Sequence, residues 1–178
     1  RELIYNHFSK NSTTTLDVSR KYHATNLSLM DTKGQTLKSL STVVKKSRIE
    51  PLSTFTINDY NKNKDIILKL INRSYDKKII IRSSTSKEDD ISESRAGEFL
   101  SIQNIDSRDN IMIGKSIDDI IDNYKLKIKN YNNEEVLIQT QTENVAISGV
   151  IFTRNLKSNA PYYVITYDDI TGLTDTVT

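Results

Sequence analysis

The fold is decided by one short run near the middle of the chain, Lys78-Ile79-Ile80-Ile81-Arg82-Ser83-Ser84. Three consecutive β-branched isoleucines favour a strand that is buried. Arg82 interrupts the run at its exit, and the polar residues that follow as far as Arg95 show no periodicity. The pattern therefore predicts a buried strand over 78–84 that leads into a long exposed loop.

Two helices and one strand are predicted before this run. A short amphipathic helix over 35–47 carries Leu37, Leu40 and Val44 at helical spacing. A strand is expected over 52–57, after Pro51, and Asn58 is the expected N-cap of the next helix. The inner face of that second helix is predicted to contain Ile67, Leu70, Ile71 and Tyr75.

The chain after the exposed loop predicts a strand over 98–104, a long helix over 116–131 and three further strands over 136–142, 146–153 and 162–167. Ser116 is the expected N-cap of the helix, and its buried stripe is predicted to be Ile117, Ile120, Ile121, Tyr124 and Ile128. The short gaps between the last strands permit an antiparallel meander. The expected fold class is α+β, with mixed or antiparallel sheets and flanking helices.

The organised region is expected to span residues 31–178, because residues 1–30 carry few apolar positions and read as a linker or the tail of an upstream region. The chain stops at Thr178, just after a turn, with no helix or cap to close the last sheet. A domain that is truncated at its C-terminus is therefore expected.

The composition excludes several classes of protein. The 178 residues include 25 Lys and Arg against 23 Asp and Glu, so the net charge of +2 argues against a nucleic-acid partner. No apolar run approaches the length of a membrane helix, so no membrane partner is expected. Without cysteine there is no disulfide scaffold or thiolate metal site, and with two histidines there is little for a metal site or a catalytic triad. The cytoplasm is the default location, and catalysis would use Lys, Arg, carboxylates or backbone amides.

Two cations are candidates for binding an anion. Arg82 must find a carboxylate, a phosphate or water at the end of its apolar strand, so an ion pair with Glu88, Asp89 or Asp90 is as good a reading as a ligand site. Lys33 stands beside Gly34 at the start of a predicted helix, where free amides attract anions. A solvated surface lysine is the commoner explanation of that pattern.

Glycines and glutamines supply weaker candidates. Gly97 lies where a loop enters a strand and suits either a close backbone approach or an ordinary turn. Gly149, inside a strand, suits either tight sheet packing or contact with a flat purine ring. Gln139 and Gln141 share one strand face, where either could bind a base edge or simply face solvent.

The order and spacing of these blocks resemble the N-terminal ATP-grasp domain of phosphoenolpyruvate synthase and pyruvate phosphate dikinase, with rifampicin phosphotransferase as a relative. Residues 31–37 resemble the family's Gly-Gly-Lys-x-Ala-Ser-Leu block, and residues 51–60 its Pro-x-Gly-Phe block. Residues 82–89 resemble Arg-Ser-Ser-Ala-Thr-x-Glu-Asp. Residues 94–99 are similar to Ser-Phe-Ala-Gly-Gln, and residues 148–155 to Ser-Gly-Val-x-Phe-Thr-x-Asn. The resemblance covers nearly all of the chain after Asp31.

The resemblance implies that Lys33 and Arg82 hold the phosphates of ATP and serve as the catalytic cations. The Gly97–Ser101 loop would cover the phosphates with amides and the Ser101 hydroxyl, and Gln139 would border the adenine. No metal ligand is expected in this chain, because the family's magnesium-binding carboxylates would lie beyond Thr178. The phospho-histidine domain of the same polypeptide would also lie beyond that residue.

The family splits ATP to AMP and phosphate, and it passes one phosphoryl group through the histidine to pyruvate, an antibiotic hydroxyl or the amide of L-glutamine. Residues 167–172 resemble the glutamine kinases most, and this segment alone is expected to be inactive. Two departures support a different hypothesis, a non-catalytic interaction module that keeps the fold and has lost nucleotide. Asp31-Thr32 replaces the Gly-Gly pair, and residues 140–142 are more polar than the family's block.

Overall fold

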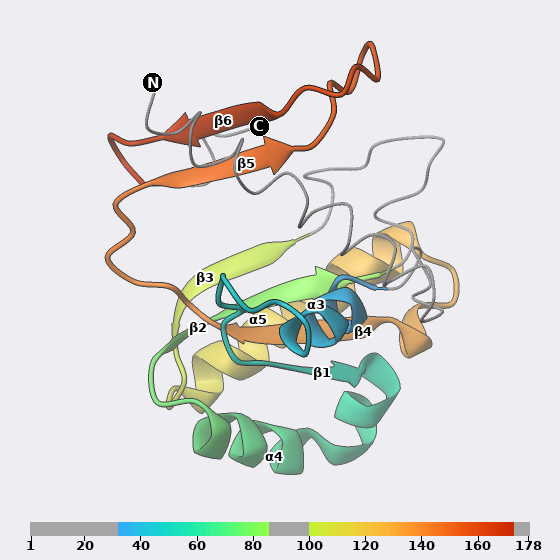
Figure 1. Ribbon diagram of the computed structural model, residues 1–178. Helices are drawn as coiled ribbons and strands as arrows, with labels where there is room; N and C mark the ends of the chain where they lie inside the picture. Colours follow the sequence, from blue (N-terminus) through green and yellow to red (C-terminus); the bar gives the residue numbers. More distant parts are fainter. Residues whose placement is uncertain (1–31, 86–99, 173–178) are drawn as a thin grey trace.

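The structure is a computed structural model that describes residues 32–85 and 100–172, and within these ranges the fold is α+β. In chain order the elements are α3 (Lys33–Ser41), β1 (Leu52–Thr56), α4 (Ile57–Ser74), β2 (Lys78–Ser84), β3 (Ser101–Asp106), α5 (Asn110–Lys127), the 3-10 turn η1 (Tyr131–Asn133), β4 (Glu135–Thr140), β5 (Ser148–Phe152) and β6 (Val164–Asp168). Figure 1 shows how these elements are arranged. The predictions for residues 1–30, for the loop over 86–95 and for Gly97 concern residues outside the described ranges.

Strand β2 lies inside a four-stranded antiparallel sheet with the order β1-β4-β2-β3. Its bounds coincide with the predicted 78–84 run. The side chains alternate as a strand requires: Ile79 and Ile81 are fully buried, whereas Ile80 and Arg82 are partly exposed on the opposite face. The isoleucine run therefore supplies the centre of the sheet.

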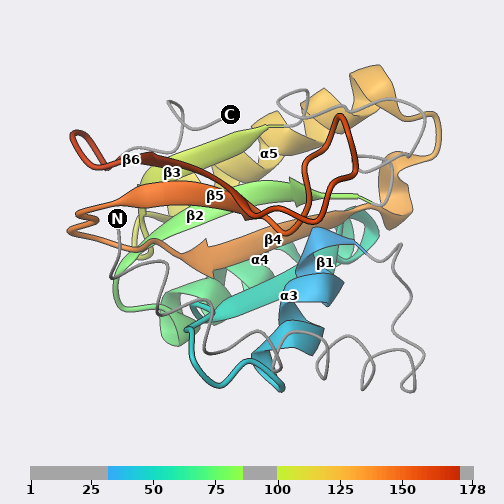
Figure 2. The same cartoon turned by 45° about the horizontal axis from the view of Figure 1, so that its top comes forward.

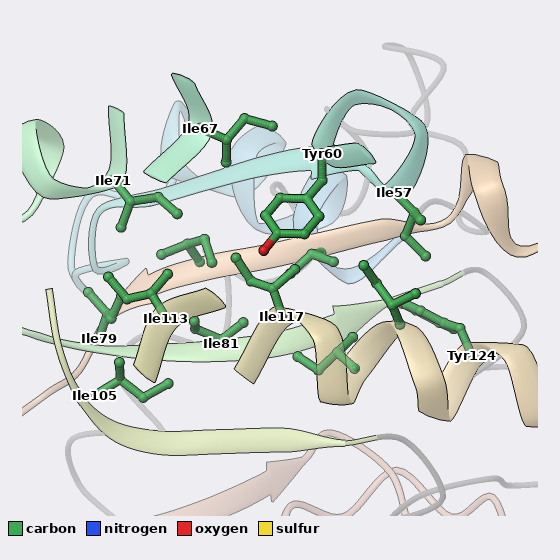
Figure 3. Packing of buried hydrophobic residues seen from close by; sticks show 14 of the residues in the cluster. Ile57, Tyr60, Ile67, Ile71, Ile79, Ile81, Ile105, Ile113, Ile117 and Tyr124 are labelled. Atoms are coloured by element: carbon green, nitrogen blue, oxygen red, sulfur yellow. The ribbon is translucent and has the colours of Figure 1, made fainter. Parts of the chain in front are cut away.

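Helices α4 and α5 cover one face of this sheet and form the core with it (Figure 3). The predicted stripe of α5 is confirmed, since Ile117, Ile120, Ile121, Tyr124 and Ile128 are all buried. Of the inner face predicted for α4, Ile67, Ile71 and the C-cap residue Tyr75 are buried as predicted. Leu70 is 53% exposed, so its assignment to the inner face is wrong. Ile57 and Tyr60, in the first turn of α4, take the core positions instead.

The helix starts differ from the prediction because other side chains bind the first amides. Thr56, not Asn58, caps α4, and it forms a capping box with Asp59. Asp109, not Ser116, caps α5, because its carboxylate accepts hydrogen bonds from the amides of Ile111 and Met112 at 3.1 and 2.9 Å. Helix α5 therefore starts earlier than predicted. Helix α3 is shorter than predicted, and it ends at Ser41 before it reaches Val44.

The predicted meander of the last three strands is wrong in its first step. Strand β4 lies between β1 and β2, and only β5 and β6 pair with each other, as a separate antiparallel hairpin. Strand β4 has no alternating pattern, since Val136, Leu137 and Ile138 are all buried, and a short apolar run of this kind does not identify the partner strands. The hairpin and helix α3 lie on the sheet face opposite α4 and α5, with α3 over β1 and the hairpin over β2 and β3 (Figure 2).

Candidate functional site

A cavity of about 900 Å³ lies between the four-stranded sheet and the hairpin. Its floor is the outer face of β2 and β3, which presents Lys78, Ile80, Arg82, Ser101 and Gln103. The linker 141–147 and the hairpin close it from the other side, with Ser148, Gly149 and Gly172 among the lining residues. The charged lining residues are two cations, Lys78 and Arg82, and one carboxylate, Glu143. The cavity is therefore polar and carries a net positive charge.

Arg82 is the lining residue whose chemistry is most specific. It is half-buried, and the register of the sheet places it directly opposite Ser101 on β3. Among the described residues, no carboxylate or carbonyl accepts a hydrogen bond from its guanidinium. The acidic partners considered from the sequence, Glu88 to Asp90, lie outside the described ranges. The described part of the chain thus leaves a planar five-donor cation directed at a cavity.

The hydroxyls that follow Arg82 are used inside the protein. Ser83, Ser84 and Thr85 are all buried. The Ser83 hydroxyl donates to the Leu100 carbonyl at 3.3 Å, and the Ser84 hydroxyl accepts from the Gly34 amide at 2.9 Å. These contacts give the run a structural role at the point where β2 meets β3 and α3.

The N-terminus of α3 is already bound to a carboxylate of the chain itself. Glu135 accepts hydrogen bonds from the Thr32 hydroxyl and the Gln35 side-chain amide, each at 2.7 Å. The backbone amide of Gln35 is bound to the Thr32 hydroxyl, and that of Gly34 to Ser84. An anion at a helix N-terminus needs free amides, and here Glu135 supplies the negative charge. The groups at the start of α3 are therefore used in contacts within the protein. A role of Lys33 as a phosphate ligand would depend on its side chain.

Lys33 and Arg82 lie on the same side of the sheet, although they are far apart in sequence. The hydrogen bond from Gly34 to Ser84 ties the neighbour of Lys33 to the residue two positions after Arg82. With a strand rise of about 3.3 Å per residue, the Cα atoms of Lys33 and Arg82 are separated by at most about 17 Å along this path. The residues that line the cavity include Arg82 and do not include Lys33.

The other predicted site residues are divided. Ser101 lines the cavity and lies opposite Arg82 on the neighbouring strand. Gln139 is half-buried outside the lining, and its side-chain amide donates to the Glu50 carbonyl at 3.4 Å. Gly97 lies outside the described residues. Gly149 lines the cavity, but a Cβ there would lie 2.9 Å from the Thr166 carbonyl oxygen and 3.1 Å from the Tyr167 Cβ, so tight strand packing alone requires a glycine.

Sequence reasoning did not single out the lining residues Lys78 and Asn104, whereas Gln141 was considered only as a possible contact of a base edge. Lys78 shares a face with Arg82 at even spacing, a signal that was available in the run itself. Asn104 has a positive φ of 62° at an irregularity in the pairing of β3, a conformation that Asn tolerates better than most residues. Its role could not be read from the sequence, because the irregularity becomes visible only once the strands are paired.

Three wider properties bear on function. In residues 32–85 and 100–172, no helix combines the length and apolarity needed to cross a membrane. In the same ranges, no three acidic, histidine or cysteine side chains gather where they could hold a metal ion. No protein-family model matches the sequence, and a search of curated proteins finds no similar sequence.

Proposed function

We propose that the chain is the ATP-binding part of a phosphotransferase similar to phosphoenolpyruvate synthase, with an ATP-grasp-like arrangement in which nucleotide lies between the sheet and the hairpin. The observation that carries this proposal is the position of Arg82: half-buried, opposite Ser101, and facing a positively charged cavity without a described protein partner. A volume of about 900 Å³ is in the range of small-molecule and cofactor sites.

The chemistry of these residues suits phosphoryl transfer. The reaction depends on positioning and on neutralising charge at the phosphate oxygens, so cations and hydrogen-bond donors suffice without a general base. Arg82 offers a forked donor set that matches two phosphate oxygens. The Ser101 hydroxyl offers a further donor on the neighbouring strand. We assign both residues to the phosphates and Ile80 to the floor of the cavity.

The remaining parts of the proposal come from the resemblance. Magnesium would be held by carboxylates beyond Thr178, and a histidine of a further domain would carry the phosphoryl group to a small acceptor, such as the amide of L-glutamine or pyruvate. The described residues would then bind and orient ATP. They would not catalyse turnover by themselves.

One observation favours the second candidate, a module that keeps this fold without nucleotide. The carboxylate of Glu135 and the hydroxyl of Ser84 already take the groups at the start of α3 that would otherwise be offered to phosphate. In that case the cavity would contribute to an interaction surface.

Calorimetric titration of the full-length protein with Mg-ATP separates the two candidates, with the wild type compared with its Arg82→Ala and Arg108→Ala variants. Arg108 is an exposed arginine outside the cavity lining and is the matched control. Loss of a charged phosphate contact costs about 1.5–3 kcal/mol, so Arg82→Ala should weaken binding by roughly 10- to 150-fold. Arg108→Ala should bind as the wild type does. Equal affinity in all three proteins would refute the assignment of Arg82, and no binding by the wild type would support the interaction module.

A further inference from the structure

The β5–β6 hairpin covers the cavity on the side opposite the four-stranded sheet (Figure 1). Strands β5 and β6 pair with each other and with no strand of the four-stranded sheet, as far as the described residues extend. The chain enters the hairpin through the linker 141–147, between β4 and β5. The placement of the hairpin over Arg82 therefore depends on how the linker is fixed to the sheet.

Gln141, the first residue of the linker, is bound to two strands. Its backbone amide donates to the Lys78 carbonyl on β2 at 2.8 Å. Its side chain pairs reciprocally with Asn104 on β3: the Asn104 amide donates to Gln141 Oε1 at 2.6 Å, and Gln141 Nε2 donates to Asn104 Oδ1 at 3.1 Å. Asn104 adopts its positive φ at the position where its backbone and side chain both meet this glutamine.

The other end of the hairpin returns to the same linker. Gly172, which follows β6, has a φ of +67°, and a Cβ at this position would collide with the carbonyl oxygen of Val145. Gln141, Asn104, Val145 and Gly172 all line the cavity. The linker is thus fixed to the sheet by its first residue and meets the end of the hairpin near its middle.

We propose that Gln141 is a positioning residue, and that its reciprocal amide pair with Asn104 sets the placement of the β5–β6 hairpin over Arg82 and Ser101. The pair lies on the wall of the cavity and fixes the start of the linker to the sheet. It therefore determines the distance between the β5–β6 hairpin and the proposed phosphate-binding residues, Arg82 and Ser101. The effect on ligand affinity rests on the proposed function, whereas the effect on hairpin placement does not.

The chain contains no cysteine, so two introduced cysteines can be spin-labelled without background. Leu126→Cys on α5 and Leu156→Cys after β5 are suitable, because these side chains are 87% and 76% exposed and neither lines the cavity. The distance distribution between the labels reports the placement of the hairpin relative to the helix layer. It is measured in the labelled parent and in three variants of it.

Gln141→Leu removes both side-chain hydrogen bonds and should broaden or shift the distribution. Gln103→Leu, the same substitution one residue before Asn104, should leave it unchanged. Gln141→Glu should restore the parent distribution, because its carboxylate still accepts a hydrogen bond from the Asn104 backbone N–H. The carboxylate can also accept from the Asn104 side chain, once the carboxamide of Asn104 turns over so that its NH₂ group faces residue 141. The proposal would be overturned if the Gln141→Leu distance distribution matched that of the parent, including the case in which the parent distribution is itself broad.

Mg-ATP titration of the unlabelled Gln141→Leu protein adds the functional readout. We expect binding about 3- to 30-fold weaker than in the wild type, with Arg82 still present. If the wild type binds no nucleotide, the proposed function fails, while the spin-label result still decides the role of Gln141. If Gln141→Leu changes the distance distribution and leaves the affinity for Mg-ATP unchanged, the claim that the position of the hairpin affects binding at Arg82 is refuted.

Discussion

The Tyr124 hydroxyl is bound to the backbone of Ser84, across the core from its own helix. It accepts a hydrogen bond from the Ser84 amide at 2.6 Å, and it donates to the Glu135 carbonyl at 2.8 Å. The phenol of Tyr124 thus joins the end of β2, the strand that carries Arg82, to the start of β4. The same Ser84 receives the amide of Gly34 through its hydroxyl, so the sheet, α5 and α3 meet at this residue.

Tyr124→Phe should destabilise the protein, because it leaves the Ser84 amide without its partner inside the core. Both Tyr124 and Ser84 are fully buried. A buried polar group that loses its partner costs about 1–3 kcal/mol. Urea unfolding of the variant gives the value. Tyr162→Phe, at a side chain that is 71% exposed, should change stability by less than about 0.5 kcal/mol, and an equal loss in both variants would contradict the role of the phenol.

Gly34→Ala and Gly114→Ala should change the free energy of unfolding in opposite directions. A Cβ on Gly34 would collide with the Thr54 side-chain methyl, so the variant must displace α3 and lose about 1–3 kcal/mol. A Cβ on Gly114, inside α5, would have no neighbour closer than the Tyr60 hydroxyl at 3.8 Å. There the better helix propensity of alanine should add about 0.5–1 kcal/mol. The two unfolding curves, measured side by side, test whether α3 packs as closely as described.

Gly149→Ala should weaken the hairpin and leave the four-stranded sheet intact. The added methyl would press on the Thr166 carbonyl of the paired strand at 2.9 Å. Because β5 and β6 form a sheet of their own, we expect faster amide hydrogen exchange in residues 148–168 and unchanged exchange in β2 and β4. Faster exchange throughout the chain would show that the hairpin and the sheet unfold together.

The stability of the protein should fall at alkaline pH. Burial raises the pKa of Tyr60 and of Tyr75 above the ordinary value of 10.0, although the nearby Lys64 cation and a hydrogen bond with Ser53, respectively, oppose the rise. A raised pKa in the folded state means that the unfolded chain loses these protons first. The contribution is therefore complete below pH 10 and is lost as pH rises through the folded-state pKa values.

Urea unfolding at pH 8, 9, 10 and 11 measures this loss. Tyr75→Phe should show a shallower fall with pH than the wild type, although hydrogen bonds to Ser53 and Ile138 make the tyrosine itself stabilising at neutral pH. Tyr162→Phe should keep the wild-type slope. A wild-type stability that is constant up to pH 11 would contradict the effect of burial on these phenols.

The elements that could be predicted are those whose pattern is set locally. The β-branched run of β2 and the spacing of Ile117, Ile120 and Tyr124 in α5 specify a buried strand and a buried helix face directly. The helix starts were harder, because several Asp, Ser, Thr and Asn residues near each start can cap equally well until the chain is folded. The partners of β4 could not be predicted, since strand pairing depends on contacts distant in the sequence.

The candidate site divides in the same way. Arg82 was identifiable because a permanent charge ends an apolar strand, and Ser101 because of the resemblance. Asn104 gave no local signal, and Gln141 was considered only as a possible base contact, because the pairing of these two residues depends on an irregularity in β3 and on the path of the linker. Glu135 was overlooked because its hydrogen bonds to Thr32 and Gln35 join residues about a hundred positions apart.

The most direct test of the central claim is a crystal structure of the protein with a non-hydrolysable ATP analogue and magnesium. We expect the phosphates between the sheet and the hairpin, with the Arg82 guanidinium donating to phosphate oxygens and the Ser101 hydroxyl beside them. Analogue bound at another place, or Arg82 paired with an acidic side chain while the cavity holds only solvent, would contradict the account.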